Sequence, residues 1–126
     1  MKKNNWLLLI AVLLAFVLRV AWLDRYPAGF TPDEANIGYN AYSILKTGKD
    51  EWGTAWWKLF FANMRSFGDY KLPLYSFLAI PSIAILGLNE FSTRLPNVIF
   101  GTFSILGIYY MAKKLYVGGL SYSTTE

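Results

Sequence analysis

The chain contains no cysteine and no histidine, and only 16% of its 126 residues are charged. These absences exclude disulfide bonds, thiol catalysis and imidazole metal ligands within the sequence. A metal site built from these residues would depend on carboxylate oxygens and water. The net charge of +4 is spread among acids and bases and forms no basic tract, so the composition does not indicate nucleic-acid binding.

Apolar residues are abundant instead, with 55% hydrophobic and 18% aromatic residues and a mean hydropathy of +0.31. This composition is typical of a membrane protein. The first apolar run, Trp6–Leu23, is interrupted only by Arg19 and approaches the length that crosses a hydrocarbon core. Lys2 and Lys3 precede it and no small-residue cleavage site follows it, so we expect an uncleaved anchor with a cytoplasmic N-terminus.

Two more apolar runs, Leu72–Leu88 and Val98–Ala112, predict an all-α, multi-pass protein of the plasma membrane. We expect three transmembrane helices over about residues 6–23, 72–88 and 95–115, with residues 24–71 forming an extracytoplasmic loop and residues 89–94 in the cytoplasm. One charge pattern opposes this topology, because Lys113 and Lys114 would then lie outside.

The predicted outer loop contains a helix-start pattern. Thr31 is a suitable N-cap, Pro32 suits the first helical position, and Glu34 stands three residues after Thr31, as in a capping box. Apolar residues then recur at helical spacing, and Gly48 is a suitable C-terminal stop. The sequence therefore predicts an amphipathic helix over Asp33–Thr47. Capping alone would explain the two acids in its first turn.

A dense group of aromatic residues follows this helix. The group contains three tryptophans and two phenylalanines: Trp52, Trp56, Trp57, Phe60 and Phe61. Such a density is typical of the headgroup level of a membrane. We therefore expect the loop to lie on the membrane surface.

Three segments of the chain resemble motifs of one enzyme family. Thr31-Pro-Asp-Glu-Ala and the helix after it resemble the first external loop of the GT-C glycosyltransferases, in particular the bacterial and archaeal relatives of the dolichyl-phosphate-mannose protein mannosyltransferases and the aminoarabinose lipid A transferases. The segment Phe67–Tyr75 resembles the family's acidic-x-Lys-Pro-Pro-Leu signature, although Leu72 stands where many relatives have the first proline. Phe91–Pro96 resembles the family's Arg-Leu-Pro turn.

The resemblance implies inverting transfer of a sugar from a polyprenyl-phosphate carrier to a glycan, lipid or protein acceptor on the outer face of the membrane. It implies that Asp33 is the essential loop carboxylate, which acts as a general base or holds a divalent cation, and that Glu34 supports it. Of these two roles for Asp33 we favour acceptor activation. The resemblance also implies that Asp69 helps to arrange the site and that Lys71 contacts the carrier phosphate.

Two residues and the length of the chain leave alternatives open. Arg19 lies at a depth that suits a phosphate contact, and snorkelling to the membrane boundary is an equal alternative. Tyr39 either lines the sugar site or packs at the interface. Members of the family are much longer, so we expect an N-terminal fragment of such a transferase. A small non-catalytic membrane subunit, or a transporter fragment, that binds a partner through its aromatic loop is the alternative function.

Overall fold

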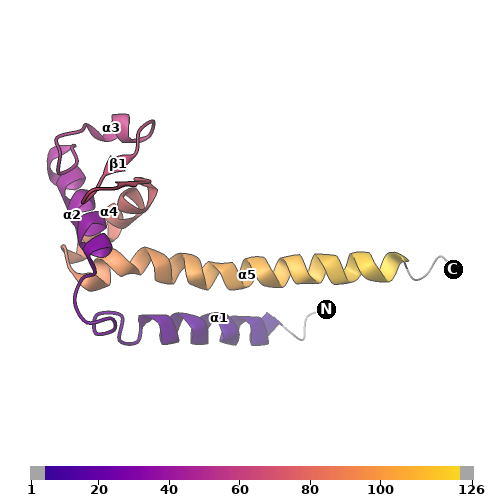
Figure 1. Cartoon of the computed structure of the whole chain (residues 1–126). Helices are drawn as coiled ribbons and strands as arrows, with labels where there is room; N and C mark the ends of the chain where they lie inside the picture. Colours follow the sequence, from indigo (N-terminus) through magenta and orange to yellow (C-terminus); the bar gives the residue numbers. More distant parts are fainter. Residues whose placement is uncertain (1–4, 123–126) are drawn as a thin grey trace. The chain divides into compact units, whose positions relative to one another are not determined.

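The computed structural model describes residues 5–122, and most of these residues are helical (Figure 1). The all-α expectation is therefore confirmed. Val20–Asn97 forms one compact unit, and the described residues on either side of it form the other. The elements in chain order are α1 (Asn5–Val20), α2 (Pro32–Thr47), α3 (Trp56–Leu59), β1 (Met64–Arg65), β2 (Tyr70–Lys71), α4 (Leu74–Leu86) and α5 (Glu90–Tyr122).

Helix α2 begins and ends where its sequence predicts. Thr31 is the N-cap, Pro32 opens the helix, and the capping box with Glu34 is complete. At the other end Gly48 has a positive φ of 70°, and its N–H donates to the carbonyl of Ile44. Glycine adopts this left-handed conformation without the steric cost that a side chain would bring, so the helix stops at Thr47.

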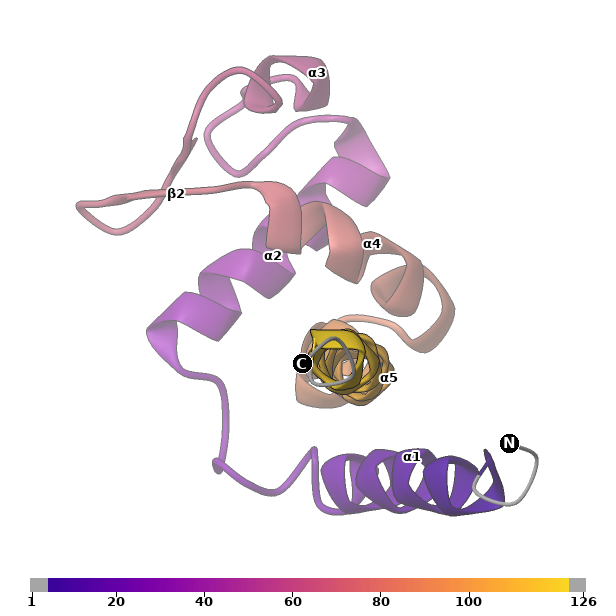
Figure 2. The ribbon, with the colours of Figure 1, turned by 90° about the vertical axis from the view of Figure 1, so that its right-hand side faces the viewer.

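The core of the unit Val20–Asn97 lies between α2 and α4, which pack side by side (Figure 2). Two small groups of buried apolar side chains join the two helices to α3 and β1. One contains Ala41, Ala79 and Ile83, and the other contains Ile44, Leu59 and Met64. Burial of these side chains is the main favourable term that holds α2 against α4.

Strands β1 and β2 form a short antiparallel hairpin in which Met64 pairs with Lys71 and Arg65 pairs with Tyr70. Gly68, in the turn, has a φ of 79°, which favours glycine. Met64 is completely buried against α2 and α3, so its strand anchors the hairpin to the core. The hairpin thereby carries Lys71 to the side of α2.

The first turns of α5 are tied to α4 by side-chain hydrogen bonds to the backbone. Tyr75 donates to the carbonyl of Thr93 at 3.1 Å, and Ser82 donates to the carbonyl of Ser92 at 2.6 Å. Pro96 lacks an N–H and cannot donate to the Ser92 carbonyl four residues earlier, which leaves that oxygen free for Ser82. Pro96 of the predicted Arg-Leu-Pro turn thus supports this contact between α4 and α5.

The three apolar runs differ in whether their helices are long and apolar enough to cross a membrane. Among the described residues, Glu90–Tyr116 of α5 is the segment long and apolar enough to do so, which supports association with a membrane. Helix α1 has 16 residues and α4 has 13. At about 1.5 Å per residue, α4 extends about 20 Å, against a hydrocarbon core of about 30 Å. The three-span prediction is therefore not confirmed.

Candidate functional site

The structure brings one acid and one base of the predicted site into direct contact. Asp33, in the first turn of α2, forms an ion pair through Oδ1 with Nζ of Lys71 in β2. The Asp33 side chain is 76% exposed and that of Lys71 is 20% exposed. Within the described residues the pair uses one carboxylate oxygen and one ammonium hydrogen, so further acceptor and donor positions remain for a ligand.

Asp33 is available for this pair because its neighbours make the helix cap. The Glu34 N–H donates to Thr31 Oγ1 at 3.3 Å, and the Thr31 N–H donates to Glu34 Oε2 at 3.1 Å. The positive end of the α2 dipole also favours a negative charge at Asp33. Thr31 and Glu34 therefore cap the helix, and Asp33 is left exposed beside them.

Glu34 has a second partner that the sequence did not indicate. Nε of Arg94 donates to its Oε1 at 2.9 Å, and Nη2 donates to its Oε2 at 3.0 Å. The Arg94 side chain is only 6% exposed. Hydrogen bonding to Arg94 is the main cause that lowers the pKa of Glu34 from its ordinary value of 4.5, Thr31 lowers it further, and burial opposes the change. Both oxygens of Glu34 are thus engaged in structure, and its support of Asp33 in catalysis stays a prediction.

Arg94 also holds the backbone that precedes α2. Its Nη1 donates to the carbonyls of Leu23 at 2.8 Å and Pro27 at 3.1 Å, and its Nη2 donates to that of Gly29 at 2.7 Å. Together with the bonds to Glu34, these contacts engage all three nitrogens of the guanidinium. One buried side chain therefore fixes the acidic end of α2 to the beginning of α5.

This contact bears on the predicted topology. We expected residues 24–71 and residues 89–94 to lie on opposite faces of a hydrocarbon core about 30 Å thick. Arg94 directly contacts Glu34 and the segment before α2, so the structure does not support that expectation. The two residues are 60 positions apart, and an arginine before Leu-Pro is equally well explained as a charge at a membrane boundary, so their pairing was not visible in the sequence.

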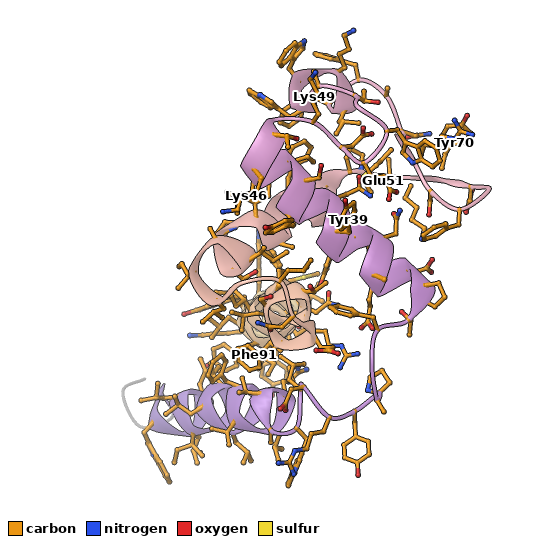
Figure 3. All side chains as sticks on the ribbon, turned by 90° about the vertical axis from the view of Figure 1, so that its left-hand side faces the viewer. Tyr39, Lys46, Lys49, Glu51, Tyr70 and Phe91 are labelled. Carbon is orange, nitrogen blue, oxygen red and sulfur yellow. The ribbon has the colours of Figure 1, made fainter. Side chains whose placement is uncertain are left out.

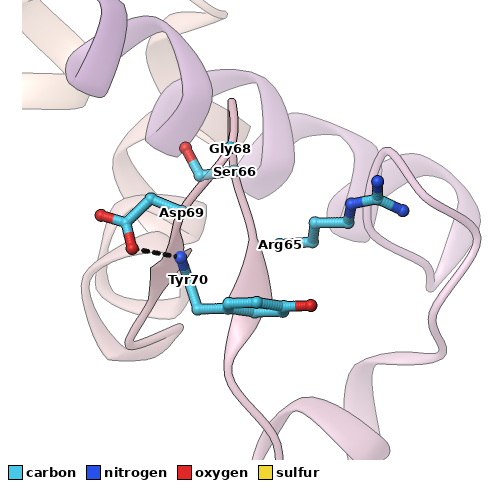
Figure 4. A pocket seen from close by; sticks show the side chains of 5 residues that line it. All are labelled: Arg65, Ser66, Gly68, Asp69 and Tyr70. Carbon is cyan, nitrogen blue, oxygen red and sulfur yellow. Dashed lines mark hydrogen bonds between the residues drawn. The ribbon is translucent and has the colours of Figure 1, made fainter.

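Asp69 takes part in the hairpin instead of the ion pair. Its Oδ1 accepts the Tyr70 N–H at 2.6 Å (Figure 4). Its carbonyl accepts the Ser66 N–H at 2.7 Å. Together with Arg65 and Gly68, these residues line an open cavity of about 200 Å³. Asp69 shapes the turn that leads into Lys71, and within the described residues it makes no hydrogen bond with Asp33 or Lys71.

The other two predicted site residues lie apart from the ion pair. Tyr39 is half exposed on α2 (Figure 3). Six helical positions place it about 120° around the helix from Asp33, so the two side chains leave α2 on different faces. Arg19 belongs to the other unit, where its side chain lies against Gly101 so closely that an added Cβ would be 3.1 Å from Nε. Its contact with a phosphate stays a prediction.

A buried polar group on α2 was missed by sequence reasoning. Nδ2 of Asn36 and Nδ2 of Asn40 both donate to Oε1 of Glu51, at 2.6 Å and 3.1 Å, and Oδ1 of Asn40 accepts the Glu51 N–H at 3.0 Å. These bonds hold the segment after α2 along that helix. Asparagines four positions apart in a helix with apolar neighbours were the available signal, since they share a face.

The acids of residues 5–122 do not form a cation site of their own. Among residues 5–122 no group of three or more acidic side chains converges. Asp33 and Glu34 each already face a basic side chain, which satisfies the charge that a divalent cation would otherwise balance. The described residues therefore bring together fewer than three carboxylates at any one place.

Comparisons with protein-family models, with curated proteins and with solved structures give no match to this chain. The resemblance to the GT-C glycosyltransferases therefore rests on the three sequence motifs alone.

Proposed function

We propose that the chain takes part in transfer of a sugar from a polyprenyl-phosphate carrier to an acceptor on the outer face of the membrane. The observation that carries this proposal is the Asp33–Lys71 ion pair, in which 38 positions of sequence separate the two residues. The resemblance links these same residues to the acceptor and to the carrier phosphate. An exposed carboxylate beside an ammonium group suits a reaction between a hydroxyl and a phosphate ester.

The reaction gives each member of the pair a separate task. The acceptor hydroxyl donates a hydrogen bond to the free oxygen of Asp33, and its oxygen attacks the anomeric carbon from the face opposite the phosphate. The new carbon–oxygen bond forms as the bond to the phosphate oxygen breaks, and Asp33 takes the hydroxyl proton. The electron pair leaves on the phosphate, whose charge the remaining N–H donors of Lys71 stabilise. The anomeric centre is inverted.

The same chemistry requires the pair to lie where carrier and acceptor meet. We propose that the chain crosses the membrane twice, through α1 and α5, and that residues 21–89 are extracytoplasmic. The short length of α4, its packing on α2 and the Arg94–Glu34 contact support this topology. It also places Lys113 and Lys114 in the cytoplasm with the basic N-terminus, as the positive-inside rule favours.

The absence of cysteine from the sequence allows a direct test of this topology. Single cysteines replace the exposed residues Lys49, Leu88 and Lys114, and intact cells are treated with a membrane-impermeant maleimide. Two spans predict labelling of Lys49→Cys and Leu88→Cys, with Lys114→Cys labelled only after the cells are opened. Three spans predict that Leu88→Cys is protected and Lys114→Cys is labelled in intact cells.

Sugar transfer itself is tested with membranes from cells that carry the intact gene or lack it. Radiolabelled polyprenyl-phosphate sugars are added, and the label is followed into glycan, lipid and protein fractions. Loss of one labelled product with the gene, and its return when the gene is restored, supports the transferase function. Identical product profiles in the two membranes, across the sugars tested, would overturn it.

A further inference from the structure

Helix α3 and the residue pair after it present an unusually apolar surface. Trp56, Trp57, Phe60 and Phe61, which we call the aromatic platform, are all exposed, and Phe61 is 94% exposed. Leu59, in the same short segment, is 1% exposed and packs inside the core. The inward leucine fixes the orientation of α3, so the exposure of the four rings follows from the packing.

Ring contacts join three of the four side chains of the aromatic platform. Trp56 meets Trp57 and Phe60 edge to face, with centroid separations of 6.1 Å and 5.8 Å. Phe60 in turn stacks on Phe77 of α4 at 4.8 Å. Such pairs are favourable beyond the area that they bury. Trp56, Trp57 and Phe60 are therefore connected to α4 through Phe77.

Positive charge accompanies the platform. No acidic residue occurs from Trp52 to Gly68, whereas Lys58 and Arg65 lie in this stretch. Lys58 is exposed between Trp57 and Leu59, and the Arg65 guanidinium lies 4.3 Å from the ring centroid of Trp52. Exposed rings mixed with basic groups match a surface that has apolar chains beneath anionic headgroups.

We propose that the aromatic platform docks on the anionic lipid headgroups of the membrane with which α5 associates. The rings enter the headgroup region, and Lys58 and Arg65 contact lipid phosphates. Tryptophan and basic residues favour this level of a bilayer, and the chain carries its own candidate membrane helix, so the lipid surface is always close. This docking does not depend on sugar transfer, because it requires only the platform and the bilayer.

Tryptophan fluorescence tests the proposal in the full chain, reconstituted in vesicles of phosphatidylcholine and phosphatidylglycerol. Trp57 is kept as the single tryptophan by replacing the other four with phenylalanine. Lipids brominated either near the headgroup or in the middle of the acyl chain serve as quenchers. A matched control has no native tryptophan and carries Phe103→Trp inside the candidate span of α5.

Docking predicts that Trp57 emits at short wavelength and is quenched most by the bromines near the headgroup, whereas the control is quenched most by the mid-chain bromines. It also predicts that Lys58→Glu with Arg65→Glu weakens the Trp57 quenching in anionic vesicles and leaves it unchanged in vesicles of phosphatidylcholine alone. Trp57 emission that resists both bromolipids and is quenched by a water-soluble quencher would overturn the proposal. Trp57 emission that resists the bromolipids and the water-soluble quencher, together with cross-linking of Trp57 to a protein, would also overturn it.

Discussion

Removing the Arg94 side chain tests the contact that positions the acidic end of α2. Arg94→Gln leaves Glu34 without its partner and removes the donors to Leu23, Pro27 and Gly29. Breaking a buried ion pair costs about 3–5 kcal/mol. Because the Glu34 side chain is 26% exposed, water can solvate the remaining charge in part. We therefore expect a loss near the lower end, about 3 kcal/mol in the free energy of unfolding.

A double-mutant cycle separates the pair from its surroundings. The free energies of unfolding of wild type, Glu34→Gln, Arg94→Gln and the double variant are measured by urea unfolding in mild detergent, with tryptophan fluorescence as the signal. Two hydrogen bonds between charged groups predict a coupling free energy of about 1.5–3 kcal/mol. A coupling below about 0.5 kcal/mol, the value of an exposed surface pair, would refute the role given to Arg94.

Three further predictions concern single positions. Gly38→Ala would place a Cβ 2.8 Å from Oγ1 of the buried Thr93 and should destabilise the fold by about 1–2 kcal/mol, whereas Gly107→Ala, with no atom in the way, should be neutral or stabilising in the same urea assay. Lys71→Met should raise the KM for the carrier-linked sugar roughly 10- to 100-fold, and Lys71→Arg should restore much of the loss; an unchanged KM in Lys71→Met would remove the lysine from the site. Because the folded state lowers the pKa of Glu34 from 4.5, its stabilising contribution is complete above that pH and is lost as pH falls through the lowered value. The wild type should lose more stability below pH 4.5 than Glu34→Gln does, and equal losses would contradict the assignment.

Local patterns in the sequence predicted local structure well. The capping box needs only Thr31 and Glu34, three positions apart, and the stop at Gly48 needs only a glycine after a helical stretch. Both features are set by backbone groups within one turn of the residue concerned. The bounds of α2 could therefore be inferred before any tertiary contact was known.

Contacts between distant segments could not be inferred in the same way. An apolar run such as residues 72–88 looks alike whether its surroundings are lipid or a packed protein surface, and hydropathy does not distinguish them. The structure shows α4 with Ala79 and Ile83 buried against α2. The resemblance named Asp33 and Lys71 separately, and the structure shows that their side chains form an ion pair.

The most direct test of the central claim is the rate of sugar transfer in cells that carry Asp33→Asn at the native locus. The matched control is Asp24→Asn, a substitution of the same type at another exposed aspartate. Loss of a general base should lower the rate about 10²- to 10⁴-fold at unchanged protein abundance and membrane insertion. Asp24→Asn should retain the wild-type rate. Wild-type transfer by Asp33→Asn would contradict the account.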